Sequence, residues 1–234
     1  MEDYKLCLLA GGKGNRMASF TKHFNKAMIP LKAKPAISHI IEKNPRDIEI
    51  VIAIAYLGEG LREYIPTAHP DRTFSFVEVD KYVGYGTGPG YGLLKCKGHL
   101  QCPFVVASVD TIVLEDIPEP NENWFGVARV PNTERFCSAK VSGGKVIRID
   151  DKVKTDNEFA FIGLAGIKDY EIFWNSLESN QKIIGGEIQI SNGLTSLIEK
   201  DLYARNFTWF DVGTPDSYAH AVKNYPQGNP YRGE

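Results

Sequence analysis

A glycine-rich loop close to the amino terminus has the residue types of a phosphate-binding site. Gly11, Gly12 and Gly14 follow the apolar run Leu6–Ala10. Such a turn after a buried strand lets backbone N–H groups approach phosphate oxygens, and glycine adopts the dihedral angles that this approach needs. Arg16, which follows the last of these glycines closely, can add a charge-assisted contact. The loop therefore predicts binding of a phosphorylated ligand.

The spacing within this loop excludes two common nucleotide-binding motifs. A Walker A loop requires Gly-Lys-Ser/Thr, whereas Lys13 is followed by Gly14. The dinucleotide-binding fingerprint of dehydrogenases requires a third small residue where this chain has Met17. A Walker-type site and a dehydrogenase site are therefore not expected.

Three segments at the start of the chain follow one another in a distinctive order. They are Ala10-Gly-Gly-x-Gly-x-Arg16-Met17, Asn25-Lys26-Ala-Met-Ile-Pro-Leu31 and Lys34-Pro35. This order resembles the opening of the sugar-nucleotide pyrophosphorylases, which transfer a nucleotidyl group to sugar 1-phosphates. Asn25 replaces that family's usual proline and Ala33 replaces its usual glycine, so neither departure removes a charged group.

The resemblance continues over almost the full length of the chain. Asp151-Lys152 stands where the family has Glu-Lys-Pro, so Asp replaces Glu and Val153 replaces Pro. The later matching segments are Gly86–Gly90, Val109–Thr111, Asp151–Lys152, Gly186–Ile190 and Trp209–Pro215.

The resemblance implies a nucleotide site. Arg16 and Lys26 are the predicted catalytic cations, because catalysis at the α-phosphorus depends on positioning and on stabilising the charge that accumulates on phosphate oxygens. Tyr85 and Thr87 would line the base site. The predicted nucleotide-binding residues are Ala10, Gly11, Gly12, Gly14, Arg16, Lys26, Tyr85, Gly86 and Thr87.

Asp110 and Asp211 are the predicted metal ligands and complete the predicted catalytic set. Asp110 follows a predicted buried strand, and open α/β sheets bind ligands at the carboxyl ends of their strands. Asp211 precedes Gly213 in the closing motif. Mg²⁺ prefers one or two carboxylates together with phosphate oxygens, so the pair predicts a Mg²⁺ cofactor. The acceptor phosphate is already ionised at neutral pH, so no general base is required.

Lys152 and Glu187 are the predicted acceptor-binding residues. Lys152 would bind the acceptor's phosphate, and the nearby Lys154 offers a competing assignment. Glu187 would contact hydroxyl or amine groups of the acceptor. The expected partners are therefore a nucleoside triphosphate and a phosphorylated small molecule.

The elements that must position these residues change in kind along the chain. Strands and helices alternate at first, which predicts an α/β fold, Rossmann-like, with a mixed but mostly parallel central sheet and helices on both faces. Consecutive strands then predict a small acceptor-binding lobe. We expect a single domain, 1–234, with a nucleotide-binding half at 1–115 and an acceptor-binding half at 116–234.

Particular elements of the second half are also predicted. Ser142-Gly-Gly144 should turn a hairpin, and Ser191 should cap a helix that runs to Lys200. Asn206–Val212 should form the last strand, and Thr214-Pro215 should start the last helix as N-cap and N1 residues. The helix before Leu100 is expected to begin at Leu93, after the glycine-rich segment.

Composition adds few constraints. The net charge of −2 offers no electrostatic argument for a nucleic-acid or membrane-surface partner. The start Met1-Glu-Asp3 is acidic, no apolar run is long enough for a membrane span, and the four cysteines form no CxxC pair. We expect a cytoplasmic protein; association into a homo-oligomer is left open.

Two other functions compete with a sugar-phosphate nucleotidyltransferase. The nearer is a cytidylyltransferase for a phosphorylated alcohol or amine such as phosphocholine, which the altered Asp151-Lys152-Val153 leaves open. The other is a non-catalytic regulatory paralogue, which would tend to lose charged site residues that this chain keeps.

Overall fold

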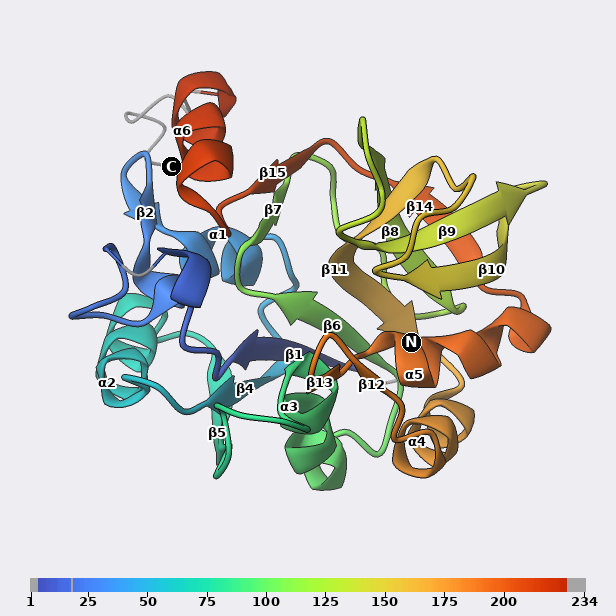
Figure 1. Cartoon of the computed structure of the whole chain (residues 1–234). Coiled ribbons are helices and arrows are strands. Elements are labelled where there is room, and N and C mark those ends of the chain that lie inside the picture. The colour runs from blue at the N-terminus through green and yellow to red at the C-terminus, as the bar shows by residue number, and fades with distance from the viewer. Residues whose placement is uncertain (1–3, 18, 227–234) are drawn as a thin grey trace.

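A mixed sheet runs through both halves of the chain in the computed structural model, which describes residues 4–17 and 19–226 (Figure 1). Its strand order is β5-β4-β1-β6-β11-β8-β14-β10-β9. These strands are β1 (Lys5–Ala10), β4 (Glu49–Ile54), β5 (Thr73–Glu78), β6 (Phe104–Ser108), β8 (Trp124–Arg129), β9 (Cys137–Ser142), β10 (Lys145–Asp151), β11 (Phe159–Ile167) and β14 (Tyr203–Asn206).

Six α-helices accompany the sheet within the described residues, together with three separate pairs of short strands. The helices are α1 (Ala36–Glu42), α2 (Glu59–Ala68), α3 (Pro89–Cys96), α4 (Tyr170–Ser179), α5 (Ser191–Leu194) and α6 (Pro215–Asn224). The short strands pair as β2 (Pro30–Leu31) with β3 (Lys34–Pro35), β7 (Thr111–Val113) with β15 (Trp209–Asp211), and β12 (Ile183–Ile184) with β13 (Glu187–Ile188).

The first half of the sheet is parallel, and its inner strands β4, β1 and β6 are buried on both faces, whereas the edge strand β5 is only half-buried. β1 lies between β4 and β6, and Leu8 pairs with Ile52 on one side and with Ala107 on the other. Alternate residues of β1 enter different cores: Cys7 packs with α3 and α4, whereas Leu8 packs with α1 and α2. A continuous apolar strand is what such two-sided burial requires. The predicted α/β fold with helices on both faces is therefore confirmed.

The second half adds mainly antiparallel strands. β11 joins the two halves by pairing antiparallel with β6 on one edge and with β8 on the other. β9 and β10 form the predicted hairpin, turned at Gly143 and Gly144. Within this half only the β8–β14 pairing is parallel, among the described residues. The parallel arrangement predicted from the sequence thus belongs mostly to the first half, and the single-domain boundaries stay a prediction.

The structure differs from the sequence prediction in three elements. α3 begins at Pro89, inside the glycine-rich segment, because proline suits the first turn of a helix. The predicted last strand, Asn206–Val212, is shorter in the structure: β15 covers only Trp209–Asp211, and β14 ends at Asn206 and joins a different sheet. Ser191 does not cap its helix; its hydroxyl donates instead to the Asp151 carboxylate at 2.6 Å. By contrast, Thr214 is the predicted N-cap of α6 and accepts from the Ser217 N–H at 3.2 Å.

In the described part of the chain no helix has the length and apolar character needed to cross a membrane. The acidic start at residues 1–3, which entered the expectation of a cytoplasmic protein, lies outside the described residues.

Candidate active site

The glycine loop leaves β1 at Ala10, beside the ends of the neighbouring parallel strands. Gly14 has a φ of +69°, which disfavours any residue with a side chain. A Cβ at this position would also lie only 3.4 Å from Cβ of Lys26, so the loop packs closely against the stem of that lysine. Arg16 is exposed in the short 3-10 turn Asn15–Met17 and forms no ion pair with any residue that the structure describes. The predicted cation is thus free to contact a phosphate.

Asn25 was not predicted as a site residue, yet it holds this region together. Its buried amide nitrogen donates to the backbone oxygens of Ala10 (2.9 Å) and Tyr56 (2.7 Å), where β1 and β4 end. Its side-chain oxygen accepts from the Ala27 N–H at 2.9 Å and so caps the short turn that carries Lys26. The one signal in the sequence was that an asparagine stands where the resembling family usually has proline.

Two short strands bring Asp110 and Asp211 together. β7 follows Asp110 directly, and β15 ends at Asp211; these strands pair antiparallel with Thr111 opposite Asp211. The Val212 N–H also donates to the Asp110 carbonyl oxygen at 3.1 Å. Backbone pairing therefore explains why residues so distant in the sequence face the same point.

Lys26 joins the two aspartates in one cluster. Its ammonium group forms an ion pair with Asp110 Oδ2, and both side chains are largely buried, with exposed fractions of 13% and 18%. The space beside Gly213 locates the rest of the cluster. A Cβ built on Gly213 would lie 2.7 Å from Asp211 Oδ1 and 2.8 Å from Asp110 Oδ2, with Lys26 Nζ at 3.3 Å. The two carboxylates and the ammonium group therefore surround a single small space.

The electrostatics of the two aspartates differ. Burial by itself would raise the pKa of Asp110, but the ion pair with Lys26 and the charge of Arg16 outweigh it and hold that pKa below its ordinary value. Burial and the neighbouring charge of Asp110 raise the pKa of Asp211. Two carboxylates in such proximity repel each other, so a cation between them would be strongly favoured.

This donor set fits magnesium. Among the described residues no group of three or more His, Cys, Asp or Glu side chains could form an all-protein metal cage. Mg²⁺ commonly binds one or two carboxylates and completes its shell with water and substrate phosphates. Because the two aspartate oxygens lie 2.7 Å and 2.8 Å from one point, an ion about 2.1 Å from each ligand could bind both after a small side-chain shift.

The loop with the predicted base-site residues packs against the predicted acceptor segment. Gly86 N–H donates to Gly186 O at 2.9 Å, and Ile188 N–H donates to Thr87 O at 2.7 Å. Tyr85 is 73% exposed and therefore available to a ligand. Thr87 is only 4% exposed, and its hydroxyl donates to Gly84 O at 2.7 Å within its own loop. The Thr87 backbone therefore takes part in this packing, whereas its buried side chain is hardly accessible to a base.

The structure brings the two predicted acceptor residues together. Lys152 Nζ lies 3.5 Å from Glu187 Oε2. Gln189 Nε2 donates to that same oxygen at 2.9 Å, which fixes the glutamate. Lys154, the competing lysine, is exposed and forms no ion pair with a described residue. The geometry therefore favours Lys152 over Lys154 as the partner of Glu187.

Asp151 is a further polar residue beside this pair that was not predicted as a site residue. Its Oδ2 atom accepts from Ser191, while its buried Oδ1 atom has no hydrogen-bond partner among the described residues. Burial, together with the charge of Asp151, raises the pKa of the neighbouring Cys137 thiol well above its ordinary value, so this thiol stays neutral. The sequence signal that could have pointed to Asp151 was the aspartate that replaces the family's glutamate at this position.

No profile of a known protein family matches the chain, but individual known proteins are similar to it. The bifunctional protein GlmU of Methanococcus vannielii is 30% identical over 221 residues, which cover 89% of this chain and 51% of that protein. Over most of its length the chain is therefore similar to sugar-nucleotide nucleotidyltransferases. Several other methanogen GlmU proteins show similar identity, and the chain spans about half the length of these curated relatives.

Solved structures show that the fold of this chain is widely shared. The UDP-glucose pyrophosphorylase of Acinetobacter baumannii superposes with a TM-score of 0.78 at 17% identity, covering 98% of this chain and 95% of that chain. The CTP:phosphocholine cytidylyltransferase of Streptococcus pneumoniae superposes with a TM-score of 0.74 at 18% identity, covering 94% and 98%. At such identities the likeness establishes the fold.

Proposed function

We propose that this nucleotidyltransferase is a Mg²⁺-dependent enzyme that joins a nucleoside triphosphate to a sugar 1-phosphate and releases pyrophosphate. The observation that carries the proposal is the cluster of Lys26, Asp110 and Asp211, which lies beside the glycine loop. The similarity to the GlmU proteins supports the sugar-phosphate branch of the family.

In the proposed reaction, a phosphate oxygen of the acceptor attacks the α-phosphorus of the nucleotide. The bond from the α-phosphorus to the bridging oxygen breaks, and pyrophosphate leaves with that electron pair. Negative charge grows on the phosphate oxygens during this exchange. Arg16, exposed and unpaired among the described residues, would bind the triphosphate. Lys26, held by Asp110, would present its ammonium group to the transferred phosphoryl group.

Asp110 and Asp211 would hold the magnesium ion. When bound, the ion would neutralise phosphate charge and polarise the reacting group. Lys152 would bind the phosphate of the acceptor, and Glu187 would contact its hydroxyl or amine groups. Because the acceptor phosphate is ionised at neutral pH, the proposal assigns no general base.

A phosphorylated alcohol or amine is the second candidate acceptor. The fold is shared with a CTP:phosphocholine cytidylyltransferase, and Asp151 is one methylene shorter than the glutamate of the sugar branch. Neither observation outweighs the sequence similarity to the GlmU proteins, which extends over most of the chain.

Pyrophosphate release tests both candidates. The purified chain should be incubated with each common nucleoside triphosphate and with a panel of sugar 1-phosphates, phosphocholine and related phosphoesters, in Mg²⁺ and in EDTA. We expect acceptor-dependent release with a sugar 1-phosphate, lost in EDTA. Pyrophosphate release only with phosphocholine would support the second candidate. If none of the acceptors in the panel led to pyrophosphate release, both candidates would be contradicted.

A further inference from the structure

The backbone at Lys152 needs support from its surroundings. Lys152 has a φ of +54°, in the left-handed region, where a residue with a Cβ is disfavoured. It directly follows β10, so the chain changes direction at the residue proposed to bind the acceptor phosphate. Neighbouring contacts must therefore hold this conformation.

Contacts before the turn account for only part of that support. The Lys152 N–H donates to the Phe136 carbonyl oxygen at 2.9 Å. The preceding residue, Asp151, is held by the hydroxyl of Ser191 at 2.6 Å. The chain that follows, residues 153–158, has no regular secondary structure before β11. What anchors this segment determines how firmly the turn is held.

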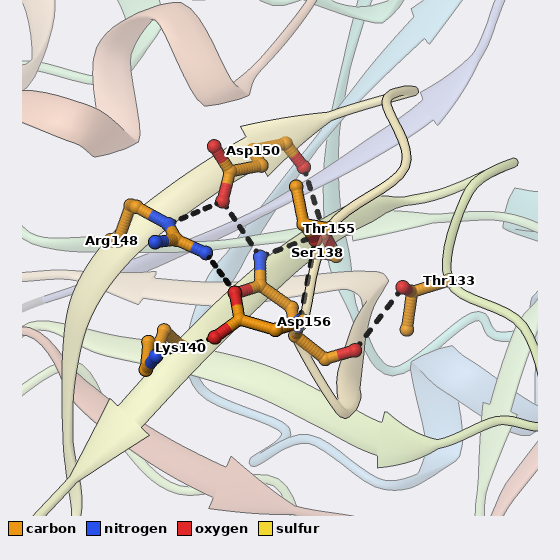
Figure 2. Close-up of polar contacts among 8 residues, drawn as sticks. Thr133, Ser138, Lys140, Arg148, Asp150, Thr155 and Asp156 are labelled. Atoms are coloured by element: carbon orange, nitrogen blue, oxygen red, sulfur yellow. Dashed lines mark hydrogen bonds and ion pairs between the residues drawn. The ribbon is translucent and has the colours of Figure 1, made fainter.

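A polar network fixes the far end of the segment to the β9–β10 hairpin (Figure 2). Arg148 donates to Asp150 at 2.6 Å and to Asp156 at 2.6 Å, so it joins β10 to the loop. Lys140 of β9 donates to the other oxygen of Asp156 at 2.6 Å. These ion pairs are largely exposed, and exposed ion pairs contribute little to the free energy of folding. They surround a residue that is buried.

Asn157 is the buried centre of this network, with an exposed fraction of 7%. Its amide nitrogen donates to Ser138 Oγ at 3.0 Å and to Asp150 Oδ2 at 2.9 Å. Its side-chain oxygen accepts from Arg148 at 3.0 Å. Both functions of the amide are used, so aspartate could not replace the two donated bonds.

Asn157 also holds the segment that lies on the other side of the Lys152 turn. Its carbonyl oxygen accepts from Thr133 Oγ1 at 3.2 Å. The Phe136 N–H in turn donates to the Thr133 carbonyl oxygen at 2.9 Å, and Phe136 provides the carbonyl that binds the Lys152 N–H. The side chain of Asn157 thus contacts β9 and β10, and its carbonyl oxygen contacts Thr133, in the segment 133–136 that binds the Lys152 N–H.

We propose that Asn157 is a positioning residue that holds the Lys152 turn in the conformation that binds the acceptor phosphate. This inference rests on the acceptor role proposed for Lys152. Asn157 does not contact the reacting groups in this arrangement; it acts through the backbone of residues 133–136 and 153–157.

The test compares Asn157→Ala with the full-length parent in two measurements. Steady-state kinetics should give an acceptor KM about tenfold higher, because small displacements of a binding group are costly, with the nucleotide KM changed less than about twofold. Amide exchange at Lys152, followed by NMR, should become faster as its bond to Phe136 is released. Lys145→Ala is the matched control: it removes an exposed ion pair to Asp201 at the opposite end of β10 and should change neither measurement.

A double variant separates positioning from general destabilisation. If Asn157 acts through Lys152, Asn157→Ala should add little to the acceptor KM of Lys152→Ala. Independent, multiplying losses would overturn the proposal, as would an unchanged Lys152 amide in a folded Asn157→Ala protein. If Asn157→Ala does not fold, Asn157→Asp takes its place, because it keeps an oxygen that accepts from Arg148 and loses the bonds donated to Ser138 and Asp150. We then expect a smaller effect, about threefold on the acceptor KM, with faster exchange at Lys152, and no change in either would refute the inference.

The acceptor role of Lys152 and the positioning role of Asn157 can fail separately. If Lys152→Ala leaves the acceptor KM unchanged, the acceptor role of Lys152 is wrong, while Lys152 amide exchange still decides whether Asn157 holds the turn. If Lys152→Ala raises that KM and Asn157→Ala does not, the acceptor role stands and the positioning role is wrong.

Discussion

Because Asp110 and Asp211 repel each other, we predict that Asp211→Asn has opposite effects on stability and on activity. Asp211→Asn keeps the side-chain shape and the oxygen that accepts from the Gly213 N–H, but it removes the charge. Because the folded protein raises the pKa of Asp211, an ionised Asp211 costs folding free energy. The metal-free variant should therefore be more stable than the parent at neutral pH, although its turnover should be nearly abolished.

The pH dependence follows from the sign of that shift. Below the ordinary carboxyl pKa of about 3.9, Asp211 is protonated in both the folded and unfolded states and costs nothing. As the pH rises through the higher pKa of the folded state, the parent loses stability that the variant keeps. Each unit of pKa displacement corresponds to about 1.4 kcal/mol, or about 3–6 °C in Tm for a domain of this size.

Mg²⁺ should reverse the order of stability of the parent and Asp211→Asn. At one hundred times its Kd a ligand stabilises the folded state by about 2.7 kcal/mol, which here corresponds to about 5–10 °C. The parent should gain this, and Asp211→Asn should gain much less. Thermal unfolding between pH 4 and 8, in EDTA and in Mg²⁺, measures both effects; Asp116→Asn, at an exposed carboxylate, is the control. Equal stability of parent and variant in EDTA at every pH would refute the repulsion argument. An equal gain from Mg²⁺ would show that Asp211 is not a ligand.

Three further predictions concern the same region. Arg16→Ala should lower turnover at least about tenfold, because a charge-assisted contact contributes about 1.5–3 kcal/mol; unchanged kinetics of the folded variant would count against the assignment. Asp110→Asn combined with Asp211→Asn should be little slower than the slower single variant, since either loss disables the same ion, and multiplying losses in pyrophosphate release would argue for separate roles. Asn25→Ala should lower the free energy of unfolding by about 2–3 kcal/mol in a urea titration, because it leaves buried carbonyls without donors; a loss under about 0.5 kcal/mol would mean that water replaces the amide.

The first half of the fold was predictable because its strands carry a strong local signal. Leu6–Ala10 is buried on both faces, and a continuous apolar run followed by glycine is typical of that environment. The meeting of Asp110 and Asp211 depends instead on two three-residue strands, β7 and β15, too short to show any periodicity. The resemblance to a known family, together with the preference of Mg²⁺ for a pair of carboxylates, suggested that these residues share a site.

The remaining differences arise where tertiary contacts decide the local structure. Asn25 is recognisable in the sequence only as a replacement of the family's usual proline, and nothing near it indicates that its amide would join the ends of two strands. Ser191 has the position of an N-cap, but a carboxylate from another element, Asp151, binds its hydroxyl. The support of the Lys152 turn by Asn157 is equally non-local. Such contacts join residues far apart in the sequence, and a single sequence does not reveal them.

Residues 84–88, the loop predicted to line the base site, pack closely against residues 186–190, the predicted acceptor segment. This packing limits how the protein could evolve. Gly88 has a φ of +111°, and a Cβ there would lie 2.6 Å from Cβ of Glu187, so the two segments have no spare room between them. An insertion or deletion in residues 84–88 would shift Glu187 through the backbone bonds at Gly86 and Thr87. Variants that change preference for the base by altering this loop should therefore change preference for the acceptor at the same time. Mutational paths to a new base and to a new sugar would be coupled in this chain, even where no residue contacts both substrates.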